Sequence, residues 1–299
     1  MLSVNPIEAV LWTFRRNEKD VVNLYNSLSS IMRLATGSRM LNFGYWKGDV
    51  QSPTEAQSKL CTLVGRLADL TSASTLIDVG SGYGFPALQW SREFMLSNIV
   101  CVNINSRQLL ERPALGLSNF ENTQMLTVSW KQTPLTYINS TSLSLPFADS
   151  TVDRIIALES AQHFKPFERF IEEAFRILQS KGLLIVAMPV LVFSGNALKK
   201  LVKLGVLNLT WSSEHYGPEY VKSIIQEQRF KIMDASLIGA QVYEPLATYY
   251  IQNRKMLQEK ITAHYPSYVE KILCKSLVKM MNVSKKGLIE YIVLKAQKL

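Results

Sequence analysis

The stretch at residues 76–84 reads Leu76-Ile77-Asp78-Val79-Gly80-Ser81-Gly82-Tyr83-Gly84, a short apolar strand that runs into three glycines spaced by two. Glycine adopts positive backbone angles and lets a ligand approach the main chain, as a strand-to-helix turn over a cofactor requires. Dinucleotide sites place the third glycine one position later, where this chain has Phe85. Asp78 adds a carboxylate that could hold an ammonium group or a loop amide. The stretch therefore predicts a site for a nucleoside that carries an amino acid, with a purely structural turn as the alternative.

Short apolar strands alternate with helices from Thr75 onward, which is typical of a parallel sheet covered on both faces. A helix over Pro166–Leu178, with Pro166 in its first turn, presents one apolar stripe to this sheet. Two later strands enclose a long helical insertion. The predicted strands are Leu76–Val79, Ile99–Ile104, Arg154–Leu158, Leu183–Met188, Phe230–Ile238 and Glu290–Lys295.

The N-terminal region has a different pattern, because its apolar residues recur at helical spacing. Val21, Leu24, Leu28 and Ile31 share one helical face, and a second helix is predicted after Pro53, over Thr54–Leu70. We therefore expect a helical cap over residues 1–70. Residues 71–299 then form the catalytic domain, with substrate-lid insertions at about 190–215 and 244–286.

Composition excludes several classes of protein. The chain has 299 residues, is 47% hydrophobic and lacks the roughly 18 consecutive apolar residues of a membrane-spanning helix. Its N-terminus lacks the residue order of a secretory signal, which predicts a cytoplasmic protein. The three cysteines, Cys61, Cys101 and Cys274, lie far apart without metal-ligand spacing, so we expect buried thiols and no metal site.

The net charge of +9 is concentrated near the C-terminus, where ten basic and three acidic residues follow from Arg254 to the end. Lysines three or four residues from apolar positions suit a solvated helix face, or contact with an anionic membrane. Few aromatic residues alternate with these lysines as a base-stacking surface requires, so no nucleic-acid partner is expected. The oligomeric state is not indicated by the sequence.

Asp78, Gly80, Gly82 and Gly84 match the first motif of class I S-adenosylmethionine-dependent methyltransferases, and the chain resembles this family over about Asn42–Met188. The resemblance implies an α/β fold that is Rossmann-like and doubly wound, with a mostly parallel sheet, a helical N-terminal cap and helical insertions near the C-terminus. It also implies that the loop, with Ser81, curls around the methionine part of S-adenosylmethionine.

Two further segments resemble the parts of the family that bind the nucleoside. The second strand ends at Asn103-Ile104, with Gln108 close behind, where family members carry an acid or amide for the ribose hydroxyls. An amide both donates and accepts hydrogen bonds, although Asn at a strand end is also a common turn former. Thr141 and Ser142 match the loop beside the adenine, and Thr141 stands where the family often has Asp.

The segment Leu41-Asn42-Phe43-Gly44-Tyr45-Trp46 resembles the stretch that small-molecule methyltransferases place before the first motif. This branch includes sterol, tocopherol, ubiquinone, mycobacterial lipid and macrolide-sugar enzymes. The resemblance implies that Tyr45 and Trp46 lie over the methionine end of the cofactor, where cation–π attraction stabilises a sulfonium. The alternative is that both side chains anchor the cap.

The run from Leu158 to Phe164 contains Glu159 and His163 and is similar to a glutamate and histidine run of the same branch. Histidine can take a proton from an acceptor hydroxyl near neutral pH, or it can instead shape the pocket. Met188 stands where some members carry a partner aspartate. Tyr25 is a second catalytic candidate, and its alternative is a half-buried aromatic on an amphipathic helix.

The sequence thus predicts methyl transfer from S-adenosylmethionine to a carbon, oxygen or nitrogen of a small, lipophilic acceptor. The basic stretch Lys199–Lys203 and the C-terminal lysines suggest peripheral contact with an anionic membrane. Three alternatives remain: an RNA or protein methyltransferase, a non-catalytic protein that binds the cofactor, and a nicotinamide oxidoreductase.

Overall fold

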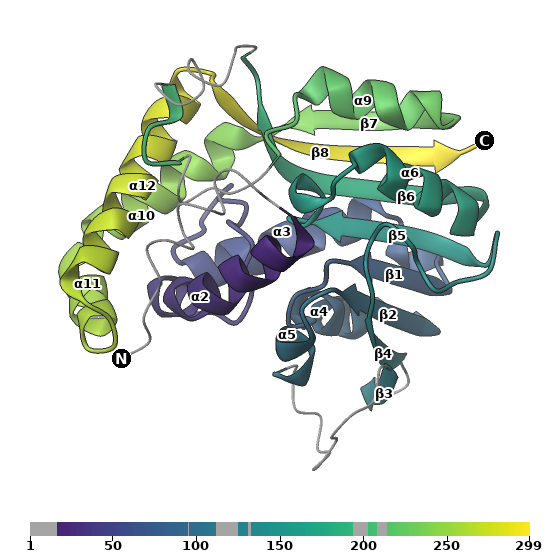
Figure 1. The fold of residues 1–299 in the computed structure, drawn as a ribbon, viewed down its shortest axis with the longest axis horizontal. Helices are drawn as coiled ribbons and strands as arrows, with labels where there is room; N and C mark the ends of the chain where they lie inside the picture. The colour runs from purple at the N-terminus through teal and green to yellow at the C-terminus, as the bar shows by residue number, and fades with distance from the viewer. Residues whose placement is uncertain (1–16, 95, 112–124, 131–132, 194–202, 208–213) are drawn as a thin grey trace. The chain divides into compact units, whose positions relative to one another are not determined.

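The computed structural model describes residues 17–94, 96–111, 125–130, 133–193, 203–207 and 214–299. Within these residues, eight strands join in one sheet in the order β3-β4-β2-β1-β5-β6-β8-β7 (Figure 1). The strands are β1 (Thr75–Val79), β2 (Asn98–Asn103), β3 (Met125–Trp130), β4 (Thr133–Asn139), β5 (Val152–Leu158), β6 (Leu178–Leu191), β7 (Phe230–Leu237) and β8 (Ile289–Lys298).

The centre of the sheet is parallel. β1 pairs in parallel with β2 and β5, β2 pairs in parallel with β4, and β5 pairs in parallel with β6. β3 is antiparallel to β4, and β8 runs opposite to β7 (Figure 1). Because parallel strands end at the same edge, the loops after β1, β2, β4 and β5 gather at one edge of the sheet. The predicted doubly wound fold is confirmed.

The described helices begin and end at residues suited to those positions. Asn17 caps α2, because its side chain accepts from the Asp20 amide at 2.9 Å, and Gly37 ends the helix with φ 69°. The apolar stripe of α6 is buried at Phe167, Phe170 and Ile171. The helices are α2 (Glu18–Thr36), α3 (Pro53–Leu67), α4 (Phe85–Glu93), α5 (Ser106–Leu110), α6 (Phe167–Ile177), α9 (Pro218–Glu227), α10 (Tyr243–Gln252), α11 (Arg254–Thr262) and α12 (Ser267–Lys285).

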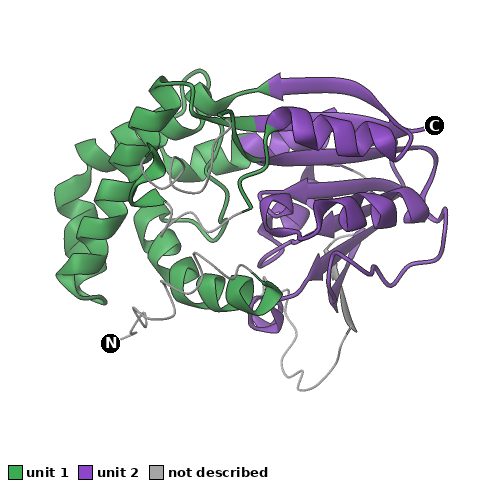
Figure 2. Ribbon diagram, turned by 45° about the horizontal axis from the view of Figure 1, so that its top comes forward, with its two compact units in different colours: residues 1–59, 189–217, 237–291 green, residues 60–188, 218–236, 292–299 purple. Residues whose placement is uncertain are grey.

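The chain divides into two compact units (Figure 2). The helical unit comprises residues 1–59, 189–217 and 237–291 and contains α2, α10, α11 and α12. The sheet unit comprises residues 60–188, 218–236 and 292–299 and holds the parallel centre of the sheet together with α4, α5, α6 and α9. In the sheet unit, β6 is buried continuously from Gly182 to Met188, which gives the apolar run expected of a strand covered on both faces.

Several predicted boundaries were wrong by a few residues. The helix predicted over Thr54–Leu70 ends at Leu67, because Asp69 takes a left-handed conformation with φ 50°. Pro166 lies just before α6, at the N-cap, rather than in its first turn.

The strands β3 and β4 were not predicted. Of the basic stretch Lys199–Lys203, only Lys203 lies in the described part of the chain.

No helix of the described residues has both the length and the apolar character needed to cross a bilayer.

Candidate functional site

The loop after β1 is held by main-chain hydrogen bonds to the neighbouring strand. The amides of Gly80 and Ser81 both donate to the Val102 carbonyl oxygen, at 2.8 and 3.1 Å, and the Gly84 amide donates to Ser81 O at 2.9 Å. Gly80, Gly82 and Gly84 have φ values of 76°, 57° and 77°, a region that other residues rarely adopt. These backbone angles favour glycine at all three positions.

Two side chains from distant strands press against this loop. A Cβ atom added to Gly80 would lie 2.2 Å from Cβ of Ser160, and one added to Gly84 would lie 2.6 Å from a ring carbon of Tyr137. Ser160 also donates from Oγ to the Val79 carbonyl oxygen at 2.6 Å. Ser160 and Tyr137 therefore fix the path of the loop, and neither was predicted as a site residue.

Asp78 lies on β1, directly before the glycines, and is 2% exposed. Its Oδ2 atom is buried and has no hydrogen-bond partner in the part of the chain that the structure describes. Burial raises the pKa of Asp78 from its ordinary value of 3.8 to about 7. Burial, followed by the charge of Asp78, also raises the pKa of Cys101 on the adjacent strand. A cationic or hydrogen-bond-donating ligand would therefore find an open acceptor at Asp78.

A network of amide side chains closes the end of β2. Asn103 Nδ2 donates to the Gly82 carbonyl oxygen at 3.1 Å and to Gln108 Oε1 at 2.9 Å. These hydrogen bonds join β2 to the loop of residues 80–84, called the glycine loop below. Asn139 on β4 donates to the carbonyl oxygens of Asn103 and Ile104, at 2.8 and 2.9 Å. Asn103 Oδ1 accepts no hydrogen bond among the described residues, so its acceptor side can meet a hydroxyl group.

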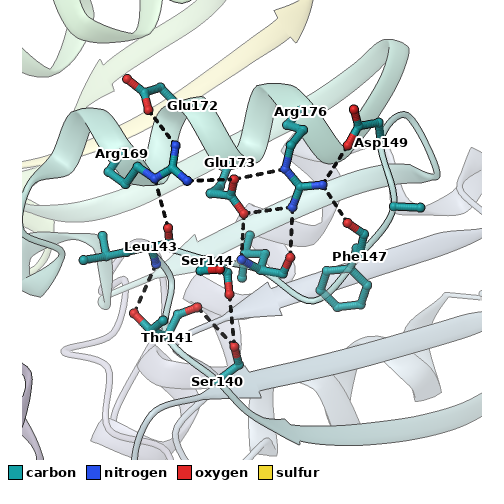
Figure 3. Close-up of polar contacts among 12 residues, drawn as sticks. Ser140, Thr141, Leu143, Ser144, Phe147, Asp149, Arg169, Glu172, Glu173 and Arg176 are labelled. Atoms are coloured by element: carbon teal, nitrogen blue, oxygen red, sulfur yellow. Dashed lines mark hydrogen bonds and ion pairs between the residues drawn. The ribbon is translucent and has the colours of Figure 1, made fainter.

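The loop after β4 is clamped by charged residues of α6, as Figure 3 shows. Arg176 donates to the carbonyl oxygens of Leu145 and Phe147, at 2.9 and 2.7 Å, and pairs with Asp149 at 2.8 Å. Glu173 accepts from the Leu145 amide at 2.7 Å and from Arg176 Nη2 at 2.8 Å. The hydrogen bond from Arg176, followed by that from Leu145, outweighs burial and lowers the pKa of Glu173.

Thr141 and Ser142 lie at the start of this clamped loop. The Leu143 amide donates to Thr141 Oγ1 at 3.2 Å, so the hydroxyl group stabilises a local turn (Figure 3). Ser142 is buried at 8% exposure. Arg169 of α6 donates from Nε to Leu143 O at 3.2 Å. The loop is thus held both by a hydrogen bond of its own and by α6.

Glu159 and His163 follow β5 in one tight turn. Glu159 has a left-handed backbone with φ 50°, a strained conformation for a residue with a side chain. Its amide donates to Ala187 O at 2.7 Å, and its carbonyl oxygen accepts from Gln162 Nε2 at 2.8 Å. The His163 amide donates to Ser160 O at 3.0 Å, which ties His163 to the residue that contacts Gly80. Both candidate side chains are half-buried.

The other predicted site residues, Tyr25, Tyr45 and Trp46, belong to the helical unit. Trp46 donates from Nε1 to Phe43 O at 3.3 Å, and its ring lies 5.8 Å from that of Tyr249 on α10. The Tyr45 amide donates to Ala56 O at 2.8 Å. Tyr25 is half-buried on α2. The predicted site residues that follow β1, β2, β4 and β5 thus lie together in the sheet unit. Tyr25, Tyr45 and Trp46 lie in the helical unit.

No group of three or more His, Cys, Asp or Glu side chains suited to a metal ion occurs among the described residues.

Comparison with known families identifies one domain. Residues 77–186 match a family model described as a methyltransferase domain, and this segment lies wholly within the sheet unit. It contains the glycine loop, Asn103, the clamped loop and His163.

Curated relatives match part of the chain. The erythromycin 3''-O-methyltransferase of Saccharopolyspora erythraea is 27% identical over 176 residues, which are 59% of this chain and 54% of that protein. A sterol 24-C-methyltransferase of Schizosaccharomyces pombe is 27% identical over 169 residues, which are 55% of this chain and 40% of that protein. The chain thus spans about half the length of the curated relatives it matches.

Solved structures extend the similarity of fold beyond the matched domain. A cyclopropane synthase from Mycobacterium tuberculosis superposes with a TM-score of 0.74 at 14% identity, over 92% of this chain and 95% of that chain. The cyclase SpnF superposes with a TM-score of 0.69 at 20% identity, over 94% of this chain and 96% of that chain. At such identities the likeness establishes the fold alone.

Proposed function

We propose that this chain, whose residues 77–186 form a methyltransferase domain, transfers a methyl group from S-adenosylmethionine to a carbon, oxygen or nitrogen of a small, lipophilic molecule. The observation that carries the proposal is the buried Asp78 side chain, whose Oδ2 atom has no hydrogen-bond partner among the described residues and which stands at the start of the glycine loop. Such a group is costly to bury unless a ligand completes its hydrogen bonds.

The described residues fit S-adenosylmethionine. Asp78 and the loop glycines would hold the methionine part, since a cationic ammonium group favours the ionised carboxylate that burial disfavours. Asn103 has an acceptor atom left for a ribose hydroxyl, because Gly82 and Gln108 engage its amide hydrogens. In our proposal Ile104, Thr141 and Ser142 border the adenine, Gln108 supports Asn103, and Glu159 lies towards the methionine end.

S-adenosylmethionine, when bound, supplies a methyl group on a sulfonium with a good leaving group already attached. The protein then mainly aligns the acceptor and excludes water. His163 either takes a proton from an acceptor hydroxyl or positions that group by a hydrogen bond. Tyr25 remains the second candidate for proton transfer, and Tyr45 and Trp46 are proposed to offer aromatic faces to the sulfonium.

The acceptor is proposed to be selected by segments outside the matched domain, among them residues 1–70, 190–215 and 244–286. The curated relatives support a small acceptor, since their names include a macrolide enzyme and sterol enzymes. We further propose a cytoplasmic protein that meets a lipophilic acceptor at an anionic membrane surface.

The test is transfer of a labelled methyl group from S-adenosylmethionine to sterols, macrolides and other lipophilic alcohols, phenols and amines, with products identified by mass spectrometry. We expect a labelled small-molecule product and no label in total RNA or protein. Cofactor binding alone does not suffice as a readout, because one of the similar structures is named a cyclase. Label that enters only RNA or protein would contradict the proposed acceptor class.

A further inference from the structure

Helix α12 of the helical unit has one face without acidic residues. Successive residues of a helix turn by about 100°, so residues 268, 271, 272, 275, 279 and 286 follow one side. This lysine face consists of Tyr268, Lys271, Ile272, Lys275, Lys279 and, directly after the helix, Lys286. The face therefore combines four cations with two large apolar side chains.

The lysine face is directed away from the packed side of α12. Glu270, the only acidic residue of the helix, is fully buried on the opposite side, where Arg254 Nε and Nη2 donate to its two oxygens at 2.9 and 3.2 Å. Tyr250 adds a hydrogen bond at 3.3 Å. The single negative charge of α12 is thus neutralised within the unit and does not offset the lysines.

The residues of this face are largely open to solvent. Tyr268 is 50% exposed and Ile272 is 42% exposed, so two large apolar side chains accompany the lysines on this face. Lys271, Lys275 and Lys286 are exposed, and Lys279 is half-buried. A cluster of four or more lysines on one face of an amphipathic helix is typical of surfaces that bind anionic lipid headgroups.

We propose that the lysine face of α12 docks on the surface of an anionic lipid bilayer. The lysines would approach the lipid phosphates, while Tyr268 and Ile272 would enter the boundary between headgroups and acyl chains. The phosphates of a nucleic acid would also attract the lysines, but a nucleic acid would gain nothing from contact with the exposed Ile272. The presence of Ile272 therefore favours a lipid surface over a nucleic acid. The lysine face would thus be the place of the proposed membrane contact. Only the purpose of this contact, access to a lipophilic acceptor, rests on the proposed function.

The test is co-sedimentation of the full chain with phosphatidylcholine vesicles that contain or lack phosphatidylglycerol. The variant Lys271→Gln/Lys275→Gln removes two charges from the lysine face. The matched control Lys255→Gln/Lys260→Gln removes two exposed charges from α11, where Glu259 lies between them. A third variant, Tyr268→Ser/Ile272→Ser, removes the apolar part.

Wild-type chain is expected to bind only the vesicles with phosphatidylglycerol. Each lysine near an anionic surface contributes about 1 kcal/mol, so the lysine-face variant should lose roughly 30-fold in partition coefficient. The control should stay near wild type, and Tyr268→Ser/Ile272→Ser should lose the part of binding that resists added salt. Stabilisation by S-adenosylhomocysteine should be equal in all variants, which shows that they are folded.

Indifference of the wild type to phosphatidylglycerol, or equal losses in the lysine-face variant and the control, would overturn the inference. So would tighter binding of an RNA duplex than of vesicles, abolished by the lysine-face substitutions. Vesicle binding is measured without acceptor and is therefore independent of catalysis. Methyl transfer without vesicle binding overturns only the docking surface, whereas vesicle binding without any methyl transfer overturns only the proposed function.

Discussion

The ionisation of Asp78 is expected to depend on whether a cationic ligand is bound. In the folded chain without ligand its pKa is about 7, against an ordinary value of 3.8. Between these values the folded state keeps a proton that the unfolded state has lost. The free energy of unfolding must therefore fall as pH rises through this window, by on the order of 4 kcal/mol in total.

We predict that Asp78→Asn removes this fall. Urea unfolding at about pH 5 and about pH 8 should show the variant gaining stability relative to wild type at the higher pH. S-adenosylhomocysteine, which carries the same ammonium group as the cofactor, should bind wild type more tightly as pH rises through 7, and should bind the variant weakly at both values. A wild-type stability equal to that of the variant at both pH values would contradict the ionisation assigned to Asp78.

His163 is expected to act on the acceptor and to contribute little to cofactor affinity. His163→Ala should lower kcat by roughly 100-fold or more if the imidazole takes the acceptor proton. The dissociation constant of S-adenosylhomocysteine, measured by calorimetry, should stay close to that of wild type. His163→Gln separates the two proposed roles, because it keeps a hydrogen-bonding group without a titratable base. Full turnover of His163→Ala with the true acceptor would rule out both roles.

The glycine loop could be predicted from sequence, since the strand and the glycines that need positive φ are adjacent in the chain. Ser160 and Tyr137 could not, although they limit the loop as strictly as its own conformation does. Their contacts with Gly80 and Gly84 arise from strand order in the sheet, which no local pattern of residues indicates. The roles of the predicted site residues themselves stay predictions.

At the scale of elements, α6 both covers the sheet and holds the loop after β4. Arg176 is the centre of this clamp, and its removal would leave Glu173, whose side chain is 5% exposed, without its strongest partner. We predict that Arg176→Ala lowers the free energy of unfolding by about 2 kcal/mol and weakens cofactor binding, because Thr141 and Ser142 lie on the same loop.

Arg169→Ala is the matched control for this prediction. Its side chain is 49% exposed and approaches Glu173 only to 3.6 Å, so the loss should stay below about 1 kcal/mol. Chemical denaturation gives both values, and calorimetry gives the cofactor affinities. Equal effects of the two substitutions would show that the clamp does not depend on Arg176.

The elements of the sheet were predictable to different degrees. β1, β2, β5 and β6 were found because most of their residues are apolar and buried. β4 was missed because Pro134, which cannot donate to a sheet ladder, argues against a strand. β3, which pairs with β4 at the edge, was missed together with it.

At the scale of the whole molecule, a ligand that binds only the folded chain must stabilise it. S-adenosylhomocysteine at a hundred times its dissociation constant should add about 2.7 kcal/mol to the free energy of unfolding, whereas NADH should add nothing. Thermal unfolding with each ligand measures the difference. Stabilisation by NADH and not by S-adenosylhomocysteine would contradict the proposed cofactor and would indicate a dinucleotide-binding loop.

Local sequence patterns could not predict which segments of the chain form each compact unit. Each unit is assembled from three separated segments of the chain, and α3, β6, β7 and β8 each continue from one unit into the other. The assembly of each unit depends on contacts between residues that are distant in the sequence. The spacing of apolar residues along the chain does not indicate such contacts. The division into residues 1–70 and 71–299 stays a prediction.

The hydrogen bonds of Asn103 make this amide hard to exchange for a carboxylate. An aspartate there, the acid usual in the family, would face the Gly82 carbonyl oxygen, now 3.1 Å from the amide nitrogen, with a second oxygen. Gln108 could turn its amide to donate instead, but a carbonyl oxygen cannot. While the Gly82 peptide keeps its present position, we therefore expect Asn103→Asp alone to destabilise the glycine loop.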